Sequence, residues 1–523
     1  MDPLPTASFT MKPAKFAFGL VAMALGVLAT LILVWCRAEQ VFSFIDPRHV
    51  VTSGFEEESL FAMWKFLNGE PIYQSPHSIP FAASYFNWLF YQIYGSVISF
   101  VTTTFHLTND WIPTIGRGFT LLVVTLGCYV SYRLFTITRR PLPRLFAPFA
   151  LCLSIILWFG PLPGYWVMTV RPDLLGLLFD TSAALWFLAY FPRRPVLAVL
   201  LAALGCYLSW SCKQINVAMP IAIGIFLLSQ QKWRYFLLFS VVLSSAYALT
   251  LLLASDVMRQ MLFLKNTAMP LSLEVWLGNF ILFLKKTLFV WPLLAVVFIF
   301  TKHKVLDPLI RLGVCGLVGW GMILLPASSK VGSADNYHFI ASLFLLCIIA
   351  GGFASLFEAR EPKIVRWRER GMILSGVCLI ALIAAAFANG SIAALHQQHE
   401  DHLSLKNCIA QLPQPVLVLN HYATLPWMNP TIAPTIAPTI NPTINQSRNT
   451  FMLAYNYWSD RQAGRIFEQN GVGGLVQQGY FNALILTPEY ATSPVFDGGS
   501  LSSYQYRPGL CQGFAIFVKE NIG

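Results

Sequence analysis

The sequence is poor in charged residues. Only 11% of its 523 residues are Asp, Glu, Lys or Arg, while 56% are hydrophobic. A soluble globular domain carries about one-quarter charged residues, so this composition excludes that class and indicates a polytopic membrane protein. The formal net charge of +11 comes from short basic clusters between apolar runs. That pattern reflects membrane topology rather than a nucleic-acid-binding stripe, so we expect no nucleic-acid partner.

Motifs for metal and redox chemistry are also lacking. No DxD, His-rich cluster or CxxC occurs near the first predicted outer loop, so the sequence predicts no dedicated metal site. A pair of carboxylates could still hold a divalent cation, and this alternative stays open. Most cysteines lie in or at the ends of predicted spans, where they act as small hydrophobic residues. Cys36, Cys408 and Cys511 are expected outside, and in an oxidising compartment the last two would form a disulfide that ties the ends of the terminal region.

Long apolar runs predict about eleven transmembrane helices, so the expected fold class is a polytopic all-α membrane protein. The first run, residues 16–35, follows Lys12 and Lys15 and has no small-residue cleavage site behind it. We therefore expect an uncleaved span that starts inside. The other predicted spans cover residues 114–136, 146–164, 174–191, 196–212, 214–230, 234–254, 287–301, 309–327, 338–357 and 372–391.

Residues 84–105 are apolar enough to be a further span, but counting them would reverse the orientation of every later span. With this segment excluded, the predicted inside loops are basic, as the positive-inside rule requires. We therefore expect residues 84–105 to lie in the outer interface, with the N-terminus cytoplasmic and the C-terminus extracytoplasmic. The basic residues of the inside loops are Arg139, Arg140, Arg144, Arg193, Arg194, Lys232, Arg234, Lys302, Lys304, Arg311, Arg360, Lys363, Arg366, Arg368 and Arg370.

Three consecutive glutamates, Glu56 to Glu58, occur in the first outer loop, residues 37–113. A carboxylate at mid-bilayer would cost about 3 kcal/mol, so we expect them outside the membrane, on an interfacial helix. The spacing from Ser53 to Glu56 is that of a capping box, and acidic residues in a first turn favour the helix dipole. A purely structural role is therefore one of two open interpretations.

The helical wheel favours the other interpretation, a catalytic role. Glu56 and Glu57 flank the centre of an apolar face, whereas Glu58 points the other way, beside Lys65, and is expected to be solvated. A carboxylate held against an apolar surface tends to have a raised pKa, which suits a general base. The apolar face consists of Leu60, Met63, Trp64 and Leu67.

Residues 392–523 are expected to form a small extracytoplasmic α/β domain after a transmembrane module of residues 1–391. The stretches "PVLVLN", "ALILTP" and "GFAIFVK" are typical of strands, and "SDRQAGRIFEQNG" has an N-cap residue and a closing Gly for a helix. Residues 430–445 repeat Pro-Thr-Ile, and Pro at every fourth position excludes a helix and a central strand. We expect an extended insertion there, either a repeat expansion in a tolerant loop or a glycan acceptor site.

Several of these features together resemble the GT-C class of integral-membrane glycosyltransferases. They are the acidic pair Glu56-Glu57, the Gly about thirteen residues later in "NGEPIY", the segment "YFNWLFYQIYG", Arg117 at the start of the next span, and "VRPDLLGLL". The resemblance covers roughly residues 10–390. It is nearest to the glycosyltransferase family 39-like branch, which includes the protein O-mannosyltransferases and the lipid A aminoarabinose transferase.

The resemblance implies an enzyme that transfers a sugar from a polyprenyl-phosphate donor to a hydroxyl acceptor at the outer face of the membrane. The acceptor class stays open between a glycolipid, a polysaccharide and a protein, and the implied location is the bacterial inner membrane. The first acidic residue of the pair would be the catalytic base. Members of the class usually have Asp-Glu where this chain has Glu56-Glu57, so Glu56 as base with Glu57 as its partner, or the reverse, both stay open.

The chemistry requires one base and cations that neutralise the leaving phosphate, but no second, proton-donating carboxylate. Each outer cation is alternatively an interfacial residue that extends its charge to water, and Arg171 can simply pair with Asp173. The candidate substrate-binding residues are Arg171, Asp173, Lys213, Lys330, Tyr337 and His338, and further outer cations expected in a loop are Lys265, Lys285 and Lys286.

Two other functions stay open as alternatives. A transporter or flippase of lipid-linked sugars would move its substrate without covalent change. We find no convincing internal repeat and expect no charged residue buried at the centre of a span, and transport sites commonly have both. A non-catalytic membrane scaffold, in which the glutamates only cap a helix, would tolerate Glu56→Gln and Glu57→Gln.

Overall fold

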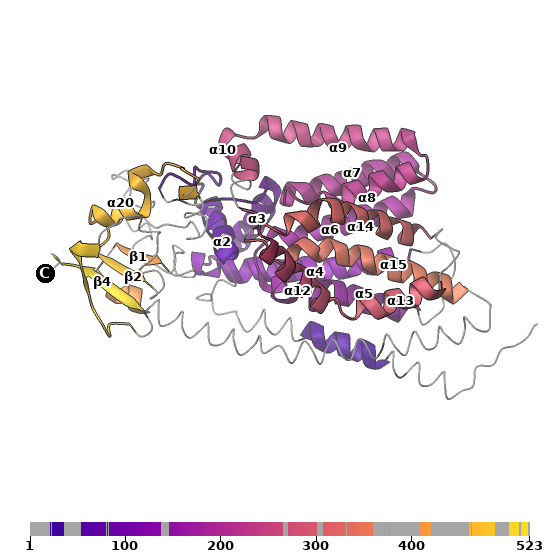
Figure 1. Cartoon of the computed structure of the whole chain (residues 1–523), viewed down its shortest axis with the longest axis horizontal. Coiled ribbons are helices and arrows are strands. Elements are labelled where there is room, and N and C mark those ends of the chain that lie inside the picture. Colours follow the sequence, from indigo (N-terminus) through magenta and orange to yellow (C-terminus); the bar gives the residue numbers. More distant parts are fainter. Residues whose placement is uncertain are drawn as a thin grey trace, which may run out of the picture.

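The computed structural model describes residues 21, 24–35, 54–137, 146–264, 270–300, 307–358, 376, 407–419, 460–486 and 501–520, except for residues 80, 82, 331, 414, 462, 512 and 513. Over these residues the chain forms a bundle of roughly parallel helices with a small sheet beyond one end (Figure 1). This agrees with the predicted fold class, an all-α membrane module with a small α/β domain.

The helices form because long runs of Leu, Ile, Val, Phe and Ala satisfy their backbone hydrogen bonds internally, as apolar surroundings require. They are α2 (Gly54–Leu67), α3 (Trp88–Phe105), α4 (Ile112–Phe135), α5 (Phe146–Phe159), α6 (Pro172–Tyr190), α7 (Pro195–Cys212), α8 (Ala218–Ser229), α9 (Trp233–Leu253), α10 (Asp256–Arg259), α12 (Leu273–Lys286), α13 (Val290–Phe300), α14 (Pro308–Ala327) and α15 (Phe339–Glu358).

Six helices of the described part are long and apolar enough to cross a membrane: α4, α6, α7, α9, α14, and α15 with the turn before it. The pair α12 and α13, bent by 73°, would make a seventh, and shorter apolar helices cover residues 24–35, α5 and α8. Among the described residues α3 does not meet this test. The predicted spans over these residues coincide with helices, whereas span 372–391 lies outside the description apart from residue 376. The count of eleven therefore stays a prediction.

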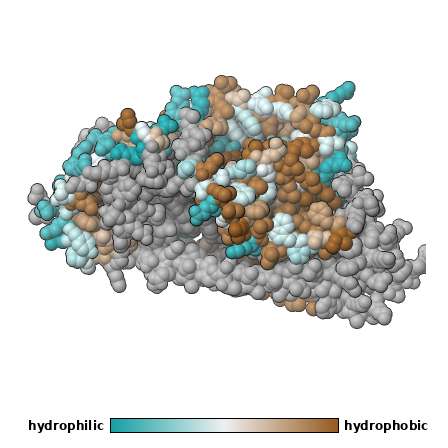
Figure 2. All heavy atoms as spheres, in the orientation of Figure 1, coloured by the Kyte–Doolittle hydropathy of each residue, from teal (hydrophilic) through white to brown (hydrophobic). Residues whose placement is uncertain are grey.

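The outside of the bundle is apolar. α9 runs along one edge, and its Leu237, Val241 and Leu249 are more than half exposed (Figure 1). Figure 2 shows hydrophobic residues gathered over the helices and more hydrophilic ones toward the sheet. An exposed apolar surface of this kind is expected where helices face lipid rather than water.

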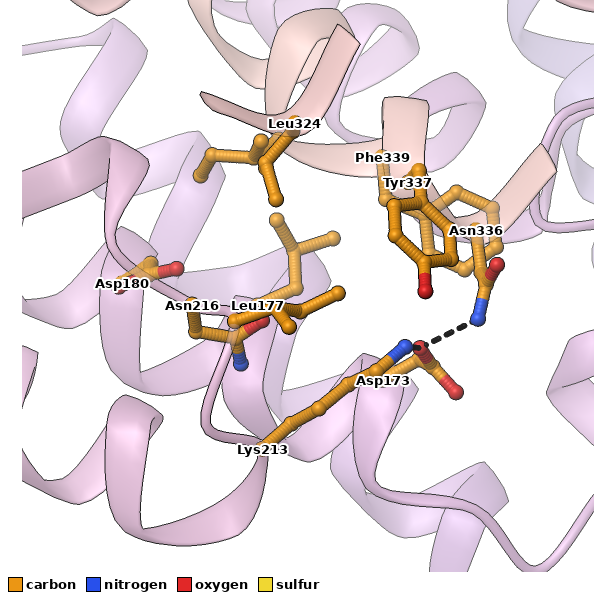
Figure 3. Close-up of a pocket in the computed structure, with 11 residues that line it drawn as sticks. Asp173, Leu177, Asp180, Lys213, Asn216, Leu324, Asn336, Tyr337 and Phe339 are labelled. Atoms are coloured by element: carbon orange, nitrogen blue, oxygen red, sulfur yellow. Dashed lines mark hydrogen bonds and ion pairs between the residues drawn. The ribbon is translucent and has the colours of Figure 1, made fainter. Parts of the chain in front are cut away.

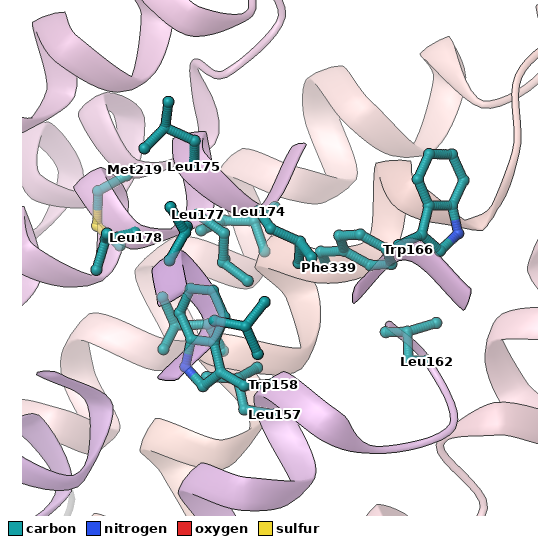
Figure 4. Packing of buried hydrophobic residues seen from close by; sticks show 14 of the residues in the cluster. Leu157, Trp158, Leu162, Trp166, Leu174, Leu175, Leu177, Leu178, Met219 and Phe339 are labelled. Atoms are coloured by element: carbon teal, nitrogen blue, oxygen red, sulfur yellow. The ribbon is translucent and has the colours of Figure 1, made fainter. Parts of the chain in front are cut away.

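The core of the bundle contains large aromatic residues whose polar atoms are paired (Figure 4). Trp158 donates its indole N–H to Ser131 Oγ at 3.1 Å. Trp166 packs edge-on against Phe339, with ring centroids 5.8 Å apart. Trp166 lies in the turn Gly164–Met168 before α6, so these contacts hold the start of α6 against the start of α15.

One predicted loop is a helix. Lys285 and Lys286, expected in a loop after the seventh span, form the last turn of α12. This amphipathic helix begins at Ser272, whose side chain accepts a hydrogen bond from Val275 N at 3.4 Å. The prediction missed it because a short helix next to a short span lacks the length that identifies a transmembrane segment. Lys265 lies outside the described residues.

The C-terminal region contains a four-stranded mixed sheet of order β1-β2-β4-β3. β1 and β2 are parallel, and the other neighbours are antiparallel. Three of the strands were predicted, and the Cys408–Cys511 disulfide is also confirmed, with Cα atoms 5.9 Å apart. The insertion 430–445 and the proposed boundary at residue 391 lie outside the described residues. The strands are β1 (Val416–Leu419), β2 (Ala483–Leu486), β3 (Tyr504–Tyr506) and β4 (Ala515–Lys519).

The helix predicted over "SDRQAGRIFEQNG" does not extend along that stretch: Asp460 and Arg461 are helical, but the later residues are not in an α-helix before Gly471. The chain turns at Gly464, where φ is 74°, and continues without helix to a short 3₁₀ turn at Glu468–Asn470. The helix of this region is α20 (Gly471–Gln477), which begins at the Gly expected to end one. A positive φ at Gly464 is compatible with a turn but not with a helix interior.

The first outer loop is docked onto the C-terminal region. His77 Nε2 lies 2.9 Å from Asp460 Oδ2, and Ile79 N donates to Glu468 Oε2 at 3.0 Å. Phe81 is fully buried in a hydrophobic cluster with residues of β1, β2 and α20. The loop therefore completes the core of the small domain, which fixes that domain beside α2 and α3.

Candidate functional site

The buried glutamate of α2 is held by α4 and by the loop before α6. Glu56 Oε1 accepts hydrogen bonds from Arg117 Nε at 3.1 Å and from Val170 N at 2.9 Å, and Glu56 Oε2 accepts one from Arg117 Nη2 at 3.0 Å. Glu56 is fully buried and Arg117 is 2% exposed. This bidentate ion pair ties three elements together at one end of the bundle. The side chain of Glu57 lies outside the described part of the structure.

A second charged cluster surrounds Asp173, in the first turn of α6. Pro172 occupies the first helical position and Asp173 follows it, an arrangement that suits a helix N-terminus. Asp173 Oδ1 accepts hydrogen bonds from Lys213 Nζ at 2.5 Å and from Asn336 Nδ2 at 2.8 Å. Arg171 Nε lies 3.5 Å from Asp173 Oδ2. The contact of Arg171 with Asp173 agrees with the pairing suggested by the sequence, whereas the pairing of Lys213 with Asp173 was not predicted.

Aromatic rings and a further ion pair support this cluster. The Arg171 guanidinium lies 4.0 Å from the centroid of a Trp166 ring. Trp166 Nε1 donates to Asp335 Oδ1 at 2.9 Å, and Asp335 also pairs with Lys286 of α12. A guanidinium stacked on an aromatic face keeps its charge while losing little side-chain freedom. The arrangement therefore holds Arg171 in a defined position.

The Asp173 cluster forms one end of a small pocket (Figure 3). In Figure 3, Asp180 lies at the opposite end from Asn336 and Tyr337. The residues that line the pocket come from α6, from α14 and α15, and from the segment after α7, and they are Asp173, Leu177, Asp180, Lys213, Ile215, Asn216, Leu324, Asn336, Tyr337, Phe339 and Ile340.

The candidate substrate-binding residues divide into two groups. Asp173, Lys213 and Tyr337 line the pocket, and Lys213 Nζ lies 5.1 Å from the centroid of the Tyr337 ring. The pKa of Lys330 is lowered to about 8. Burial is the main cause, and repulsion from the nearby charge of Lys213 adds to it. His338 does not line the pocket. It packs against aromatic rings instead, and the centroid of its ring lies 4.9 Å from that of the Phe283 ring.

Charge at this end of the pocket is predominantly positive. Arg171 and Lys213 pair with the carboxylate of Asp173, Lys330 lies near Lys213, and Asp335 nearby pairs with Lys286. A buried excess of cations attracts a dianionic or monoanionic group such as a phosphate, for which Arg and Lys are the usual protein partners. Geometry and charge together indicate an anion-binding end.

Asp180 corrects the expectation that no charged residue is buried at the centre of a span. It lies midway along α6 and is 3% exposed. Its Oδ1 atom accepts no hydrogen bond from any described residue. The sequence signal was available, since an Asp within an apolar run is costly and marks a candidate functional site. Asn216 and Asn336, which the sequence analysis also missed, carry no comparable signal because isolated amides are common in loops.

Glu58 and Lys65 correct the prediction of a solvated face on α2. Glu58 is 5% exposed and Lys65 is fully buried. The loop after α2 folds back over this face, and Lys65 Nζ donates to the carbonyl of Ile72 at 2.6 Å. Burial lowers the pKa of Lys65 to about 8. Burial and then the Glu58 charge raise the pKa of Tyr85. A helical wheel cannot foresee a loop that covers the polar side.

Among the described residues, no three His, Cys, Asp or Glu side chains come together in a group that could hold a metal ion. The cations around Asp173 already neutralise its charge.

Comparisons with known proteins identify the fold. No protein-family model matches the chain, and no curated protein sequence matches it either. Among solved structures, the chain is similar to the crystal structure of ArnT from Cupriavidus metallidurans bound to undecaprenyl phosphate, with a TM-score of 0.53 and 11% sequence identity. The match covers 94% of this chain and 97% of that one. The chain therefore has the fold of a GT-C membrane glycosyltransferase.

Proposed function

We propose that this chain, which has the fold of a GT-C membrane glycosyltransferase, transfers a sugar from a polyprenyl-phosphate donor to a hydroxyl acceptor. The observation that carries the proposal is the cluster at one end of the pocket, in which Arg171 and Lys213 pair with Asp173 and Lys330 lies near Lys213. In the similar structure, ArnT is bound to undecaprenyl phosphate. A lipid phosphate of this chemistry matches the excess of positive charge at the pocket.

The reaction needs few groups. The acceptor oxygen attacks the anomeric carbon, the bond from that carbon to the phosphate oxygen breaks, and the phosphate leaves with the electron pair. A protein carboxylate takes the proton of the acceptor hydroxyl. The cations stabilise the charge that develops on the phosphate, so the leaving group needs no proton. Direct displacement inverts the configuration of the anomeric carbon.

We assign the two glutamates of the acidic pair different tasks. Glu56 already accepts hydrogen bonds from Arg117 and from Val170 N, and hydrogen bonds to a carboxylate make it a weaker base. Its contacts suit a positioning residue that holds α2 against α4. Glu57, its neighbour in the sequence, is then the proposed general base. The alternative order, with Glu56 as the base, requires its release from Arg117.

The proposal includes a location and orientation. Asp173 lies in the first turn of α6, next to Val170, whose N–H donates to Glu56 of α2. The cation end of the pocket is therefore at the end of the bundle that carries α2 and, beyond it, the C-terminal sheet (Figure 1). An oxidising compartment favours the Cys408–Cys511 disulfide, which supports an extracytoplasmic C-terminus and a cytoplasmic N-terminus. We propose the bacterial inner membrane as the location, and a glycolipid, a polysaccharide or a protein as the acceptor.

The test uses purified wild-type protein with a panel of undecaprenyl phosphoryl sugars and cell-envelope extract as the source of acceptor. Wild type is expected to release undecaprenyl phosphate, and Glu57→Gln to reduce that rate at least about 100-fold, as for loss of a general base. Glu274→Gln, at an exposed position of α12, is the matched control and should leave the rate unchanged. No release by wild type with any acceptor would contradict the proposal.

Glu56→Gln separates the two assignments of the base. If Glu56 only positions α2, this variant loses stability together with activity, and Glu57→Gln loses activity alone. If instead Glu57→Gln is fully active and Glu56→Gln is folded but inactive, the order of the two glutamates is reversed.

One observation favours a second candidate function, transport of lipid-linked sugars. Asp180 is buried in the middle of a span, as charged residues of transport pathways often are. A flippase would move fluorescent lipid-linked sugar across proteoliposome membranes and return it chemically unchanged. Movement without release of undecaprenyl phosphate would replace transfer by transport.

A further inference from the structure

The inner end of the pocket contains a carboxylate with an unused hydrogen-bonding position. Asp180 lines the pocket, is 3% exposed, and has an Oδ1 atom that accepts no hydrogen bond from the described residues. Ser209, whose hydroxyl donates to the carbonyl of Gly176 at 2.9 Å, also lies within hydrogen-bonding reach of the Asp180 side chain. Cys206, Cys212 and Tyr247 lie near Asp180 as well, and Asn216 lines the same pocket. Buried polar groups in folded proteins are nearly always paired with protein or ordered water, so this atom is available to accept a hydrogen bond from a bound group.

The other end of the pocket defines what that ligand carries. Asp173 and Asp180 are separated by seven residues on one helix, so they lie on the same face about 10 Å apart along its axis. Between them the walls are apolar, formed by Leu177, Leu324 and Phe339. A pyranose or furanose ring joined to a phosphate matches this layout, with the phosphate at the cations and the hydroxyl groups of the ring toward Asp180.

We propose that Asp180, together with Asn216, is the specificity-determining end of the donor site and hydrogen-bonds hydroxyl groups of the sugar. This inference rests on the proposed function and specifies the part of the donor that the site distinguishes. A sugar hydroxyl donates to the free carboxylate oxygen. The Asn216 side chain, which also donates to the carbonyl of Ser209 at 3.2 Å, presents further hydrogen-bonding capacity to the ring oxygens.

The chemistry of the two ends excludes the opposite orientation of a phosphorylated ligand. A phosphate at Asp180 would meet a buried carboxyl group with no Lys or Arg of the described residues in ion-pair contact with it, while the cations would face neutral hydroxyl groups. A buried charge is costly unless it is paired, so a phosphate is stabilised at the cations and not at Asp180. The sugar end and the phosphate end of the pocket are therefore distinct.

The experiment compares binding of two probes to purified full-length protein in detergent: undecaprenyl phosphate, and the undecaprenyl phosphoryl sugar that wild type binds best from the panel. Asp180→Ala should weaken binding of the sugar-bearing lipid roughly 10- to 100-fold, the loss expected when a buried hydrogen-bonding group of the ligand is left without its partner. Binding of undecaprenyl phosphate should change less than about 3-fold, because its phosphate does not reach Asp180.

Two further variants keep the test decisive. Asp180→Asn retains the size of the side chain, so it reports on hydrogen bonding even if Asp180→Ala does not fold. Thr181→Val changes the adjacent buried residue of α6, which does not line the pocket, and should leave the ratio of the two affinities unchanged. Asp180→Asn should also alter the order of preference among the sugars of the panel.

The outcomes distinguish a wrong assignment of Asp180 from a wrong proposed function. If folded Asp180→Ala and Asp180→Asn both bind the two probes with the wild-type ratio, the assignment of Asp180 is wrong while the proposed function stands. If wild type binds neither probe, the proposed function itself fails, and the inference that rests on it fails as well.

Discussion

The buried ion pair between Glu56 and Arg117 makes a sharp prediction about stability. Both side chains are almost completely excluded from solvent, and two hydrogen bonds join them. Arg117→Met leaves the Glu56 carboxylate buried without its cation, and Glu56→Gln leaves the guanidinium without its anion. Breaking a buried pair in this way typically costs about 3–5 kcal/mol, because the remaining charge has no counter-ion.

The double variant is expected to be more stable than the two single changes suggest. Removing both charges at once leaves no uncompensated ion, and the glutamine oxygen can still accept the hydrogen bond from Val170 N. The cost of Glu56→Gln with Arg117→Met should therefore be at least about 3 kcal/mol less than the sum of the single costs. That difference is the coupling energy of the pair.

The assay is reversible unfolding of the detergent-solubilised protein by SDS, followed by tryptophan fluorescence and converted to free energies of unfolding. Arg133→Met is the matched control, because Arg133 lies on the same helix but is exposed, and it should change the free energy by less than about 0.5 kcal/mol. Single costs below about 1 kcal/mol, or additive costs in the double variant, would refute the argument that Glu56 is held by a structural ion pair.

Other contacts lead to further predictions. The lowered pKa of Lys65, about 8 against an ordinary 10.5, means that between these values the unfolded chain binds more protons than the folded one. The free energy of unfolding should thus rise by up to about 3 kcal/mol from pH 8 to pH 10.5, and Lys65→Met should remove that rise in pH-dependent unfolding. Alkylation before reduction should leave Cys408 and Cys511 unlabelled in mass spectrometry, and Cys408→Ser should destabilise the C-terminal region by about 4 kcal/mol, since the bridged residues are 103 apart. Asp460→Asn should weaken the contact with His77 by about 1 kcal/mol and speed hydrogen exchange in the loop segment that carries His77, whereas unchanged exchange would mean that this contact does not hold the loop.

Several features of this protein follow from the sequence alone. Apolar runs of membrane-spanning length identify helices wherever they occur, because a backbone in apolar surroundings must satisfy its own hydrogen bonds. The strands of "PVLVLN" and "ALILTP" were recognisable because short runs of β-branched and aliphatic residues between turn residues usually form strands. The proximity of Arg171 to Asp173 was also predictable, since two residues of one short segment cannot lie far apart.

The tertiary structure decided which of the charged residues are brought together. Lys213, Asn336 and Asp173 come from three separate helix ends, and their hydrogen bonds depend on how those helices pack. The same holds for Glu56, whose position on an apolar helix face suggested a base but whose partner Arg117 lies 61 residues away. Periodicity describes one helix at a time, whereas burial and pairing of charges are set by its neighbours. Glu58 shows the same limit: it is buried because a later loop covers the helix face that the sequence left polar.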